Sequence, residues 1–579
     1  MPMPEKLDTE PLPLSPTFHF SPKNIFPNFN HINQIRIHKN FFLKIFIPAR
    51  RLLYIKSFWA LLLLIILSGC GEQTAKPRTG GILKLSAPGG TPDNLNPVLT
   101  DYGLTVALWQ LIFNNLVRIN PDMTPQPDLA YLWQISPDGL AYTFYLRPNV
   151  RFHDGVELTS ADIAFTYDLI KKYRTYATRH TLFDAINHWE TPDKYTFKII
   201  LNKPFGLSLT TLSEPILPKH LLEGQDIINN SFNRSPVGSG PFRFKEWTPD
   251  NRITLEANPD YYEGRPHLDR IEAHGYDTPE QIWAALMKGE TDLTFFLPRE
   301  KFETAARDPY FKTYQFPYIL VYALEYNLAD PIVRDRAVRQ ALAHIINVPE
   351  IIQAIEGGYG EPATGPFIPD VWWYNPNPKP IPYNPIKAQE LLVSAGWYPN
   401  ENGVLEKDGR EFRLNLLVNS DVREGYKMAT LIHNNLLCLG IKTELLEFDY
   451  QKYLKGEIEV PEDASAYLTF FSLTAEPSDL AKIWHSAKRD PRIKLWPYHN
   501  LEVNRLFELG QTLTNLEERQ KTYQQIHQLI YDDQPATFLY FFYNLCVMRD
   551  GFKNTDALFS AVMPFWTIKD WQAKTGDGK

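Results

Sequence analysis

Residues 136–162 read SPDGLAYTFYLRPNVRFHDGVELTSAD and contain a turn, a strand, a second turn and the start of a helix. The alternation at 143–146 predicts the strand, and Asp-Gly at 154–155 predicts the second turn. The motif Thr-Ser-Ala-Asp at 159–162 places a carboxylate three residues after a hydroxyl, as in a capping box, and predicts a helix to Lys171. This order of elements indicates an α/β domain.

Strands and helices interleave in the same way along the rest of the chain. Apolar or alternating runs predict strands at 81–87, 195–201, 414–418 and 443–448. Caps and apolar faces predict helices at 104–116, 330–345, 384–396 and 514–532. No repeat of about 20 to 50 residues is visible, which argues against a solenoid or a propeller.

The 136–162 stretch, with its residues in this order, resembles the signature of solute-binding protein family 5, the oligopeptide-, dipeptide- and nickel-binding lipoproteins of ABC importers. Further segments match this family in register: Asn94-Leu95-Asn96-Pro97, Val237-Gly238-Ser239-Gly240-Pro241-Phe242, Asn258-Pro259-Asp260-Tyr261-Tyr262, Arg339-Gln340-Ala341-Leu342, Gly357-Gly358-Tyr359-Gly360, Ala395-Gly396-Trp397 and Ile483-Trp484-His485-Ser486. The likeness covers about Gly80 to the C-terminus and is strongest to the peptide-binding members.

This resemblance implies an α/β structure, the type II periplasmic binding protein fold, with two lobes joined by a hinge and an extra subdomain in lobe I. The expected domains are the first part of lobe I at 80–322, with the extra subdomain at about 121–230, lobe II at 323–505, and the C-terminal part of lobe I at 506–579. Closure of the lobes around a ligand would be a hinge motion.

The N-terminal part of the chain has the features of an export signal. Basic residues precede the apolar run 58–67, which is shorter than the roughly 20 residues of a membrane span. The run ends in Leu-Ser-Gly-Cys at 67–70, which resembles the lipobox of bacterial lipoproteins and makes Cys70 the expected lipidated residue. A signal anchor with an accidental cysteine is the alternative.

We therefore expect an N-terminal extension with the signal n-region at 1–57, the h-region and lipobox at 58–70, and a linker at 71–79. The extension is unusual for a signal peptide, and a mis-assigned start codon is our leading explanation. The lipid would hold the mature protein on the periplasmic or extracellular face of the cell envelope. A monomer is expected, because no heptad or exposed apolar helix calls for a partner.

Composition excludes several classes of protein. The net charge is −8, and because residues 1–69 hold eight basic and three acidic residues, the remainder is more acidic still. An acidic body argues against nucleic acid as a partner. The three cysteines, Cys70, Cys438 and Cys546, form no CxxC and support neither a zinc site nor a disulfide framework. We expect no metal and no cofactor.

No catalytic motif is present in the sequence. Gly238-Ser239-Gly240 lacks the spacing of a hydrolase elbow, and neither HExxH nor a Walker loop occurs. His153, in Phe-His-Asp-Gly, could suggest acid/base chemistry, but the segment is typical of a strand that ends in a turn. We interpret His153 as structural, with a local hydrogen bond. The protein is not expected to be an enzyme, because a hydrolase needs a nucleophile with a base.

The resemblance also implies how a ligand would be held. In the peptide-binding relatives, an Asp in a pattern like Trp-x-x-Asp-x-x-Asp/Glu-Pro meets the terminal ammonium of the ligand. This chain reads FFSLTAEP at 470–477, so Leu473 stands where that Asp is expected. Glu476 either replaces it or has a structural role. The main chain of a peptide would pair with strand edges, whatever its sequence.

Four further residues are predicted to contact the ligand. Asp101 and Tyr102 follow Asn-Pro at 96–97 at the distance at which relatives line the cleft. Tyr450 corresponds to a cleft aromatic of the second lobe. Trp372, in a Trp-Trp-Tyr run among prolines, is either a stacking platform or a loop anchor.

Together these features predict an extracytoplasmic lipoprotein that captures oligopeptides and delivers them to the permease subunits of an ABC importer with cytoplasmic ATPases. A nickel- or metallophore-binding member of the family would need a histidine or arginine cluster in the cleft, for which His485 is the nearest candidate. A ligand sensor without transport is the other alternative. Neighbouring genes for membrane subunits and ATPases would favour import.

Overall fold

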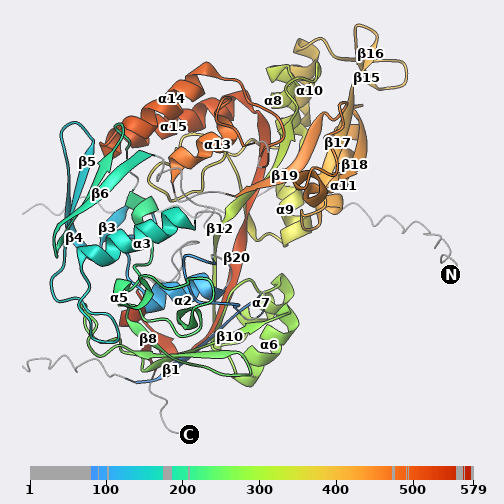
Figure 1. Ribbon diagram of the computed structural model, residues 1–579. Coiled ribbons are helices and arrows are strands. Elements are labelled where there is room, and N and C mark those ends of the chain that lie inside the picture. The colour runs from blue at the N-terminus through green and yellow to red at the C-terminus, as the bar shows by residue number, and fades with distance from the viewer. Residues whose placement is uncertain are drawn as a thin grey trace, which may run out of the picture. The chain divides into compact units, whose positions relative to one another are not determined.

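A computed structural model describes residues 80–88, 90, 92–100, 104–173, 185–206, 209–472, 476–490, 492, 494–555, 565 and 567–574 (Figure 1). The predicted export segment with Cys70, and the predicted ligand residues Asp101 and Tyr102, lie outside these ranges, as does Leu473. No helix within them has both the length and the apolar character that a membrane crossing requires.

One large sheet holds half of the strands. It has the order β18-β17-β19-β12-β20-β11-β1-β10-β9-β8, with β13 paired to β20 off this path. Its strands are β1 (Ile82–Pro88), β8 (Phe242–Trp247), β9 (Arg252–Ala257), β10 (Arg270–Tyr276), β11 (Leu293–Thr294), β12 (Phe311–Tyr326), β13 (Gly360–Pro362), β17 (Arg413–Asn419), β18 (Lys442–Phe448), β19 (Ala466–Ser472) and β20 (Ala536–Arg549).

The smaller sheets and the helices surround this sheet. The remaining strands are β2 (Val117–Ile119), β3 (Pro125–Pro127), β4 (Ala130–Ile135), β5 (Ala141–Leu146), β6 (Ile186–Asp193), β7 (Thr196–Leu201), β14 (Tyr398–Pro399), β15 (Leu405–Lys407), β16 (Arg410–Glu411), β21 (Phe552–Lys553) and β22 (Gln572–Ala573). The α-helices are α2 (Leu104–Ile112), α3 (Ser160–Lys172), α5 (Lys219–Leu222), α6 (Pro279–Lys288), α7 (Arg299–Ala306), α8 (Arg336–Ile345), α9 (Val348–Glu356), α10 (Pro385–Ser394), α11 (Gly425–Leu437), α12 (Tyr450–Leu454), α13 (Ala481–Trp484), α14 (Leu501–Thr512) and α15 (Leu516–Asp533).

Strand direction decides where loops meet. β1, β10 and β11 run parallel, and so do β17, β18 and β19. The first set joins β20 and the second joins β12 through antiparallel pairs, and β12 and β20 are themselves antiparallel. The carboxyl ends of the two parallel sets therefore point toward each other along the β12–β20 pair.

The long strands β12 and β20 connect the two halves of the sheet (Figure 1). Their pairing shifts register between Pro317 and Val321. Pro317, which has no N–H to donate, stands at this irregularity. Register shifts of this kind bend a strand pair. We therefore infer that residues 317–321 are the hinge.

Each half of the sheet has its own core. We call lobe I the residues that pack with β1 and β8–β11, including a smaller core of α6, α7 and the end of β20. We call lobe II the residues that pack with β17–β19 and α8–α11. A further core joins α13–α15 to β12, β19 and β20. The domain limits given by the sequence stay predictions.

The 136–162 stretch folds as the sequence predicts. β5 lies inside the four-stranded sheet β4-β5-β7-β6, and α3 follows it. The N–H and the hydroxyl of Thr159 donate to Asp162 Oδ2 at 2.8 and 3.0 Å, which completes the capping box. The helix ends at Lys172, one residue later than predicted.

α2 is shorter than predicted and ends at Ile112, not at residue 116. The carbonyl oxygen of Ile112 accepts the N–H of Gly240 at 2.8 Å. A Cβ at Gly238 would lie 2.0 Å from the same oxygen. The Val-Gly-Ser-Gly-Pro-Phe segment can approach the helix end only because these positions are glycines. The helix therefore ends at a contact with a distant part of the chain.

The predicted start of a helix at Asp330 is wrong. α8 begins at Arg336, and the side chain of Asp335 accepts a backbone N–H of its first turn at 2.9 Å. Asp330 instead accepts the N–H of Ile332 at 2.7 Å. A side chain that bonds to the backbone two residues on stabilises a turn in place of a helix. The helices predicted to start near 384 and 514 are confirmed, with Asn384 and Asn515 as caps.

Candidate ligand-binding groove

A cavity of about 520 Å³ lies between the two lobes beside the hinge, and we call it the interlobe groove. Its lining residues are Pro279, Phe296, Leu297, Pro298, Arg299 and Glu300 of lobe I, Ala354, Ile355, Glu356, Tyr359, Arg423, Glu424 and Lys427 on the lobe II side, and Phe542, Tyr543 and Leu545 of β20. Its walls include the loops after β11 and β17. Ligands of open α/β sheets bind at such carboxyl ends of strands.

Aromatic rings form one wall of the groove and continue along the hinge. The ring of Phe296 lies 5.2 Å from that of Tyr318, which lies 5.2 Å from Phe542. Phe542 is 6.0 Å from Tyr322, whose ring is 5.1 Å from Tyr540. Pairs of rings at such distances contribute about 0.5–1.5 kcal/mol each beyond their burial. The groove thus offers apolar surface along a well-packed hinge.

Charged side chains face the groove from both lobes. Glu356 accepts hydrogen bonds from Arg423 Nη2 at 2.5 Å and from the hydroxyl of Tyr540 at 3.1 Å. Burial, together with the negative charge of Glu356, raises the pKa of Tyr540. Arg299 of lobe I and Lys427 of lobe II add two further cations to the lining. A ligand carboxylate would find donors on both walls.

Two residues of the lining have strained backbones. Phe296 and Glu424 have φ values of 57° and 56°, in the left-handed region that non-glycine residues seldom adopt. The N–H of Phe296 donates to Asn544 Oδ1 at 2.9 Å, which helps to hold this conformation. Such strain persists where the surroundings enforce it, and it is commonest at binding and catalytic sites. One strained residue on each wall marks the groove as a candidate functional site.

Glu476, predicted as a possible partner of the ligand's ammonium group, forms a buried ion pair. Arg519 Nη2 donates to Glu476 Oε1 at 2.7 Å, and the side chains are 4% and 5% exposed, respectively. The N–H and hydroxyl of Ser478 also donate to Oε1. This arrangement neutralises the charge of Glu476 inside the protein, and it favours the structural role over the ligand-binding role.

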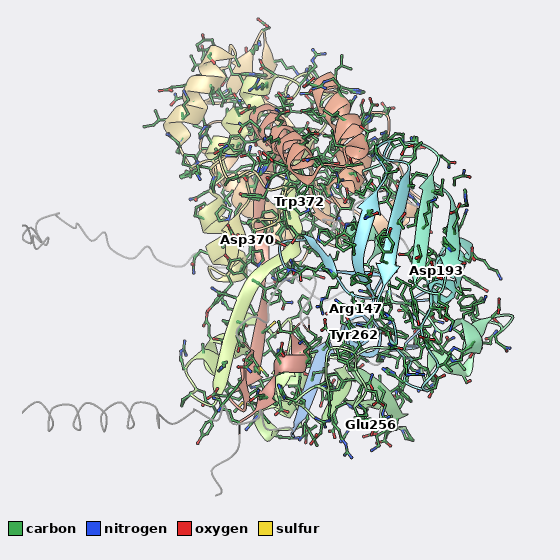
Figure 2. All side chains as sticks on the ribbon, turned by 90° about the vertical axis from the view of Figure 1, so that its left-hand side faces the viewer. Arg147, Asp193, Glu256, Tyr262, Asp370 and Trp372 are labelled. Carbon is green, nitrogen blue, oxygen red and sulfur yellow. The ribbon has the colours of Figure 1, made fainter. Side chains whose placement is uncertain are left out.

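Trp372 lies in the same cluster as Glu476. The guanidinium of Arg519 is 5.6 Å from the ring centroid of Trp372. The backbone of Trp372 donates to the carbonyl oxygen of Asp122 at 3.0 Å and accepts from Gln520 Nε2 at 2.5 Å. Figure 2 shows Trp372 near Asp370 and apart from Arg147 and Tyr262 of lobe I. These contacts favour the loop-anchor interpretation, although the ring is only partly buried.

Tyr450 lies at the start of α12, after β18, and is not part of the groove lining. Its hydroxyl donates to the carbonyl oxygen of Arg492, and its ring stacks on Tyr453 at 6.2 Å. Burial raises the pKa of Tyr450. The structure therefore brings Glu476 and Trp372 together but does not add Tyr450 to their cluster.

A second buried ion pair was not anticipated from the sequence. Lys494 Nζ lies 3.0 Å from Glu325 Oε1, and the side chains are 1% and 0% exposed. Glu325 also accepts the N–H of Trp496 at 3.0 Å, and Lys494 lies over the ring of Trp484 at 4.6 Å. Burial lowers the pKa of Lys494. The sequence feature that could have indicated this pair was Glu325, a single acidic residue within the apolar run of β12.

The histidines singled out in the sequence have structural partners. His153 accepts the N–H of Gly238 at Nδ1 (3.2 Å), and its Nε2 lies 3.1 Å from the oxygen of Gly240. These bonds are distant in sequence, so the expectation of a local bond is wrong. His485 is buried and lies 3.3 Å from Glu508. In the part of the chain that the structure describes, no three His, Cys, Asp or Glu residues form a group that could hold a metal ion.

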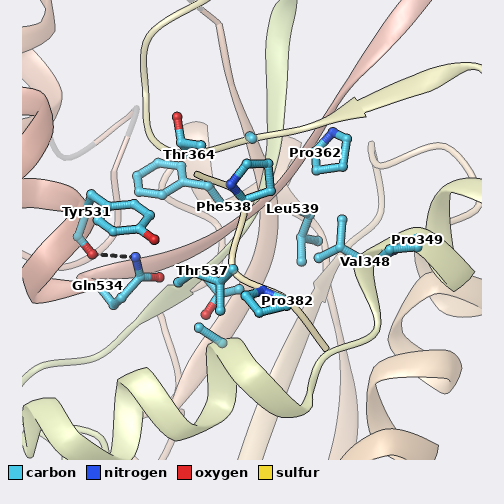
Figure 3. Close-up of a pocket in the computed structure, with 14 residues that line it drawn as sticks. Val348, Pro349, Pro362, Thr364, Pro382, Tyr531, Gln534, Thr537, Phe538 and Leu539 are labelled. Carbon is cyan, nitrogen blue, oxygen red and sulfur yellow. Dashed lines mark hydrogen bonds between the residues drawn. The ribbon is translucent and has the colours of Figure 1, made fainter. Parts of the chain in front are cut away.

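A smaller cavity of about 110 Å³ lies apart from the groove, beside the loop 363–384, which we call the Pro-rich loop (Figure 3). Its lining comes from α8 and α9, the loop, the end of α15 and the start of β20, and is mostly apolar. Gln534 Nε2 donates to the carbonyl oxygen of Tyr531 at 2.6 Å beside it. None of the lining comes from β1 to β11.

Comparison with known proteins decides the family. The model of the bacterial extracellular solute-binding proteins, family 5 middle region, matches residues 124–480. This chain belongs to that family. The resemblance noted in the sequence is confirmed.

Relatives in this family match nearly the whole folded part of the chain. The oligopeptide-binding protein AppA of Bacillus subtilis is 30% identical over 503 residues, which cover 84% of this chain and 91% of AppA. Its solved structure, in complex with a nonapeptide, has a TM-score of 0.62 at 28% identity and covers 86% of this chain and 100% of that one. This similarity confirms the α/β fold with two lobes joined by a hinge.

Two further solved structures differ in what they hold. DppA from Helicobacter pylori, in complex with the peptide STSA, is 26% identical with a TM-score of 0.62 and covers 85% of this chain and 99% of DppA. NikZ from Campylobacter jejuni, in complex with Ni(L-His), is 26% identical with a TM-score of 0.64 and the same coverage. This chain is thus a solute-binding protein of a family whose members hold different solutes.

Proposed function

We propose that this protein captures peptides outside the cytoplasm and delivers them to the permease of an ABC importer that cytoplasmic ATPases drive. The observation that carries this proposal is the similarity to the oligopeptide-binding AppA over 84% of the chain. The interlobe groove, with its volume of about 520 Å³, is of the size that small-molecule and peptide ligands occupy in proteins.

The groove suits an extended peptide. Strand ends from both lobes can pair with its main-chain N–H and C=O groups, which must find partners once they leave water. The rings of Phe296 and Phe542 can contact side chains of varied shape. Arg423, Lys427 and Arg299 can bind a carboxylate. Recognition of this kind depends on the peptide backbone and one charged end more than on the peptide sequence.

Three further residues are proposed to contact the ligand. Asp101 and Tyr102 are proposed from the family resemblance, and Tyr450 from the second lobe. Because Arg519 already neutralises Glu476, we do not expect Glu476 to bind a second cation. Trp372 is proposed to support the loop beside this cluster.

The place of action is proposed from the sequence. Export would be directed by the segment 58–70, and lipid on Cys70 would tether a monomer through the linker 71–79. Such a tether holds the protein at the outer side of the membrane, where the permease collects ligand.

A thermal-shift measurement on residues 71–579 without lipid tests the proposal. Free di- to nonapeptides of mixed sequence should raise the melting temperature, since a ligand that binds only the folded state stabilises it. A shift with nickel–histidine and none with peptides would favour the nickel-binding alternative, to which the similarity with NikZ points. No shift with either would favour a sensor of another ligand.

A further inference from the structure

The segment Gly-Gly-Tyr-Gly at 357–360 leaves lobe II and contacts lobe I. It follows α9, whose Ile351 and Ile352 pack in the core of lobe II, and it continues into β13. Neither hinge strand includes it. Figure 1 shows α7 of lobe I and α9 of lobe II on the same side of β12 and β20. The segment therefore lies where a contact between the lobes would act beside the hinge.

Tyr359 packs against lobe I. Its ring lies 5.3 Å from that of Phe302 on α7, at an interplanar angle of 78°. It packs against the small core of lobe I that holds Leu297 and Leu545. Its carbonyl oxygen accepts the N–H of Tyr543 at 3.3 Å. A residue that follows a lobe II helix thus inserts its ring into lobe I.

Gly357 supports a second contact between the same two elements. The side chain of Arg299, at the start of α7, lies so close that a Cβ at Gly357 would be 2.1 Å from Arg299 Nη1. Gly357 has a φ of 64° and ends α9 in the left-handed region. The left-handed conformation favours glycine here, and an added Cβ would displace the side chain of Arg299.

We propose that Arg299 and Phe302 of α7, with Gly357 and Tyr359, form an interlobe latch that sets the equilibrium between open and closed lobes. Two strands joined at a bend resist separation of the lobes only weakly, whereas the latch adds contacts that exist in one arrangement of the lobes and are lost in another. An aromatic contact of this size shifts such an equilibrium by about two- to tenfold.

The latch is coupled to the groove, and in this respect the inference rests on the proposed function. Glu356 directly precedes Gly357 and binds Arg423, and both line the groove together with Arg299 and Tyr359. A ligand carboxylate that binds Arg423 competes with Glu356 for the guanidinium. Occupation of the groove therefore acts on the residues that carry the latch.

Distances between nitroxide labels in the ligand-free protein test the latch independently of any peptide. The exposed Cys438 of lobe II carries one label, and a Lys288→Cys variant on α6 of lobe I carries the other. Tyr359→Ala should broaden the distance distribution or shift it to longer distances. Tyr310→Ala, which removes a 73% exposed ring of lobe I, should leave it unchanged.

A second variant covers the case in which Tyr359→Ala fails to fold. Arg299→Ala removes only the part of the latch at the start of α7, and it should shift the distribution in the same direction. Its control is Arg307→Ala, since that side chain at the end of α7 is 80% exposed. Wild-type distributions in both folded latch variants would overturn the proposal. Because any ligand carried from the cell is first removed by unfolding, dialysis and refolding, this result does not depend on what the groove binds.

Discussion

The guanidinium of Arg519 binds the carboxylate of Glu476 at 2.7 Å with both side chains almost fully buried. The pair joins α15 to the residues that follow β19, next to the loop that carries Trp372. The segment that begins at Glu476 is therefore fixed by an internal charge pair.

Loss of one partner of this pair should be costly. Arg519→Met leaves Glu476 buried without its counter-charge, and removal of one partner of a buried pair costs about 3–5 kcal/mol in the free energy of unfolding. The double variant Arg519→Met/Glu476→Leu should recover much of this loss. Urea denaturation measures the free energy of unfolding of the single and the double variant. The control is Arg505→Met, which breaks the exposed pair with Glu502 and should stay near wild type. Equal stability of Arg519→Met and Arg505→Met would refute the assignment.

Arg423 should recognise the carboxylate of a bound peptide. Arg423→Ala should weaken binding of a peptide with a free C-terminus by about 10- to 100-fold, the value of a charge-assisted hydrogen bond. Binding of the same peptide with an amidated C-terminus should change little. Calorimetric titration measures both affinities, with Arg410→Ala, an exposed site away from the groove, as the control. An equal loss for both peptides would show that Arg423 does not read the carboxylate.

Two buried histidines should make the folded protein less stable as the pH is lowered. Burial lowers the pKa of His153 and of His527 to about 4, from an ordinary value of 6.5. Between these values the unfolded chain binds more protons than the folded one, so stability is full above pH 6.5 and is lost as the pH falls toward 4. At pH 5 each histidine should cost about 2 kcal/mol relative to pH 7.

His527→Gln separates this effect from other acid-sensitive groups. The imidazole of His527 contacts Thr364 and the backbone of Asn375, so the variant tests a residue that holds the Pro-rich loop. Its stability in urea should decline less between pH 7 and pH 5 than that of the wild type. His188→Gln, at a side chain 52% exposed, should keep the wild-type dependence. An unchanged slope in His527→Gln would contradict the burial argument.

The glycine at 238 should be indispensable. A Cβ there would lie 2.0 Å from the carbonyl oxygen of Ile112, and backbone cannot move aside as a side chain can. Gly238→Ala should cost at least about 2 kcal/mol of stability. Gly551→Ala is the matched control, because nothing lies within 4 Å of its added Cβ. The melting temperatures of both variants show whether Gly238 is needed for packing against the end of α2. Equal melting temperatures would contradict this role.

Features that depend on neighbouring residues were predictable from the sequence. The capping box of Thr159 and Asp162 lies within four residues, and its helix is confirmed. The end of α2 at Ile112 was not predictable, since Gly240 causes it from far along the chain. At Asp330 a hydrogen bond from the N–H of Ile332 stabilises a turn in place of a helix start. The same residues are compatible with a turn or with a helix start, so the sequence alone could not decide between them.

The same distinction holds for the candidate site. The sequence pointed to Glu476 and Trp372, but not to Arg519, which brings them together. It gave no sign of Phe296 or Arg423, because their place in the groove depends on how two distant parallel strand sets face each other. Family motifs predict the scaffold well, whereas the residues that line a space between lobes need the fold.

The most direct test of peptide capture is native mass spectrometry of residues 71–579, purified from cells without added ligand, followed by release of the bound molecules under denaturing conditions. We expect a set of short peptides of mixed sequence that leave the protein on denaturation. A bound nickel complex, or a single non-peptide molecule at full occupancy, would contradict it.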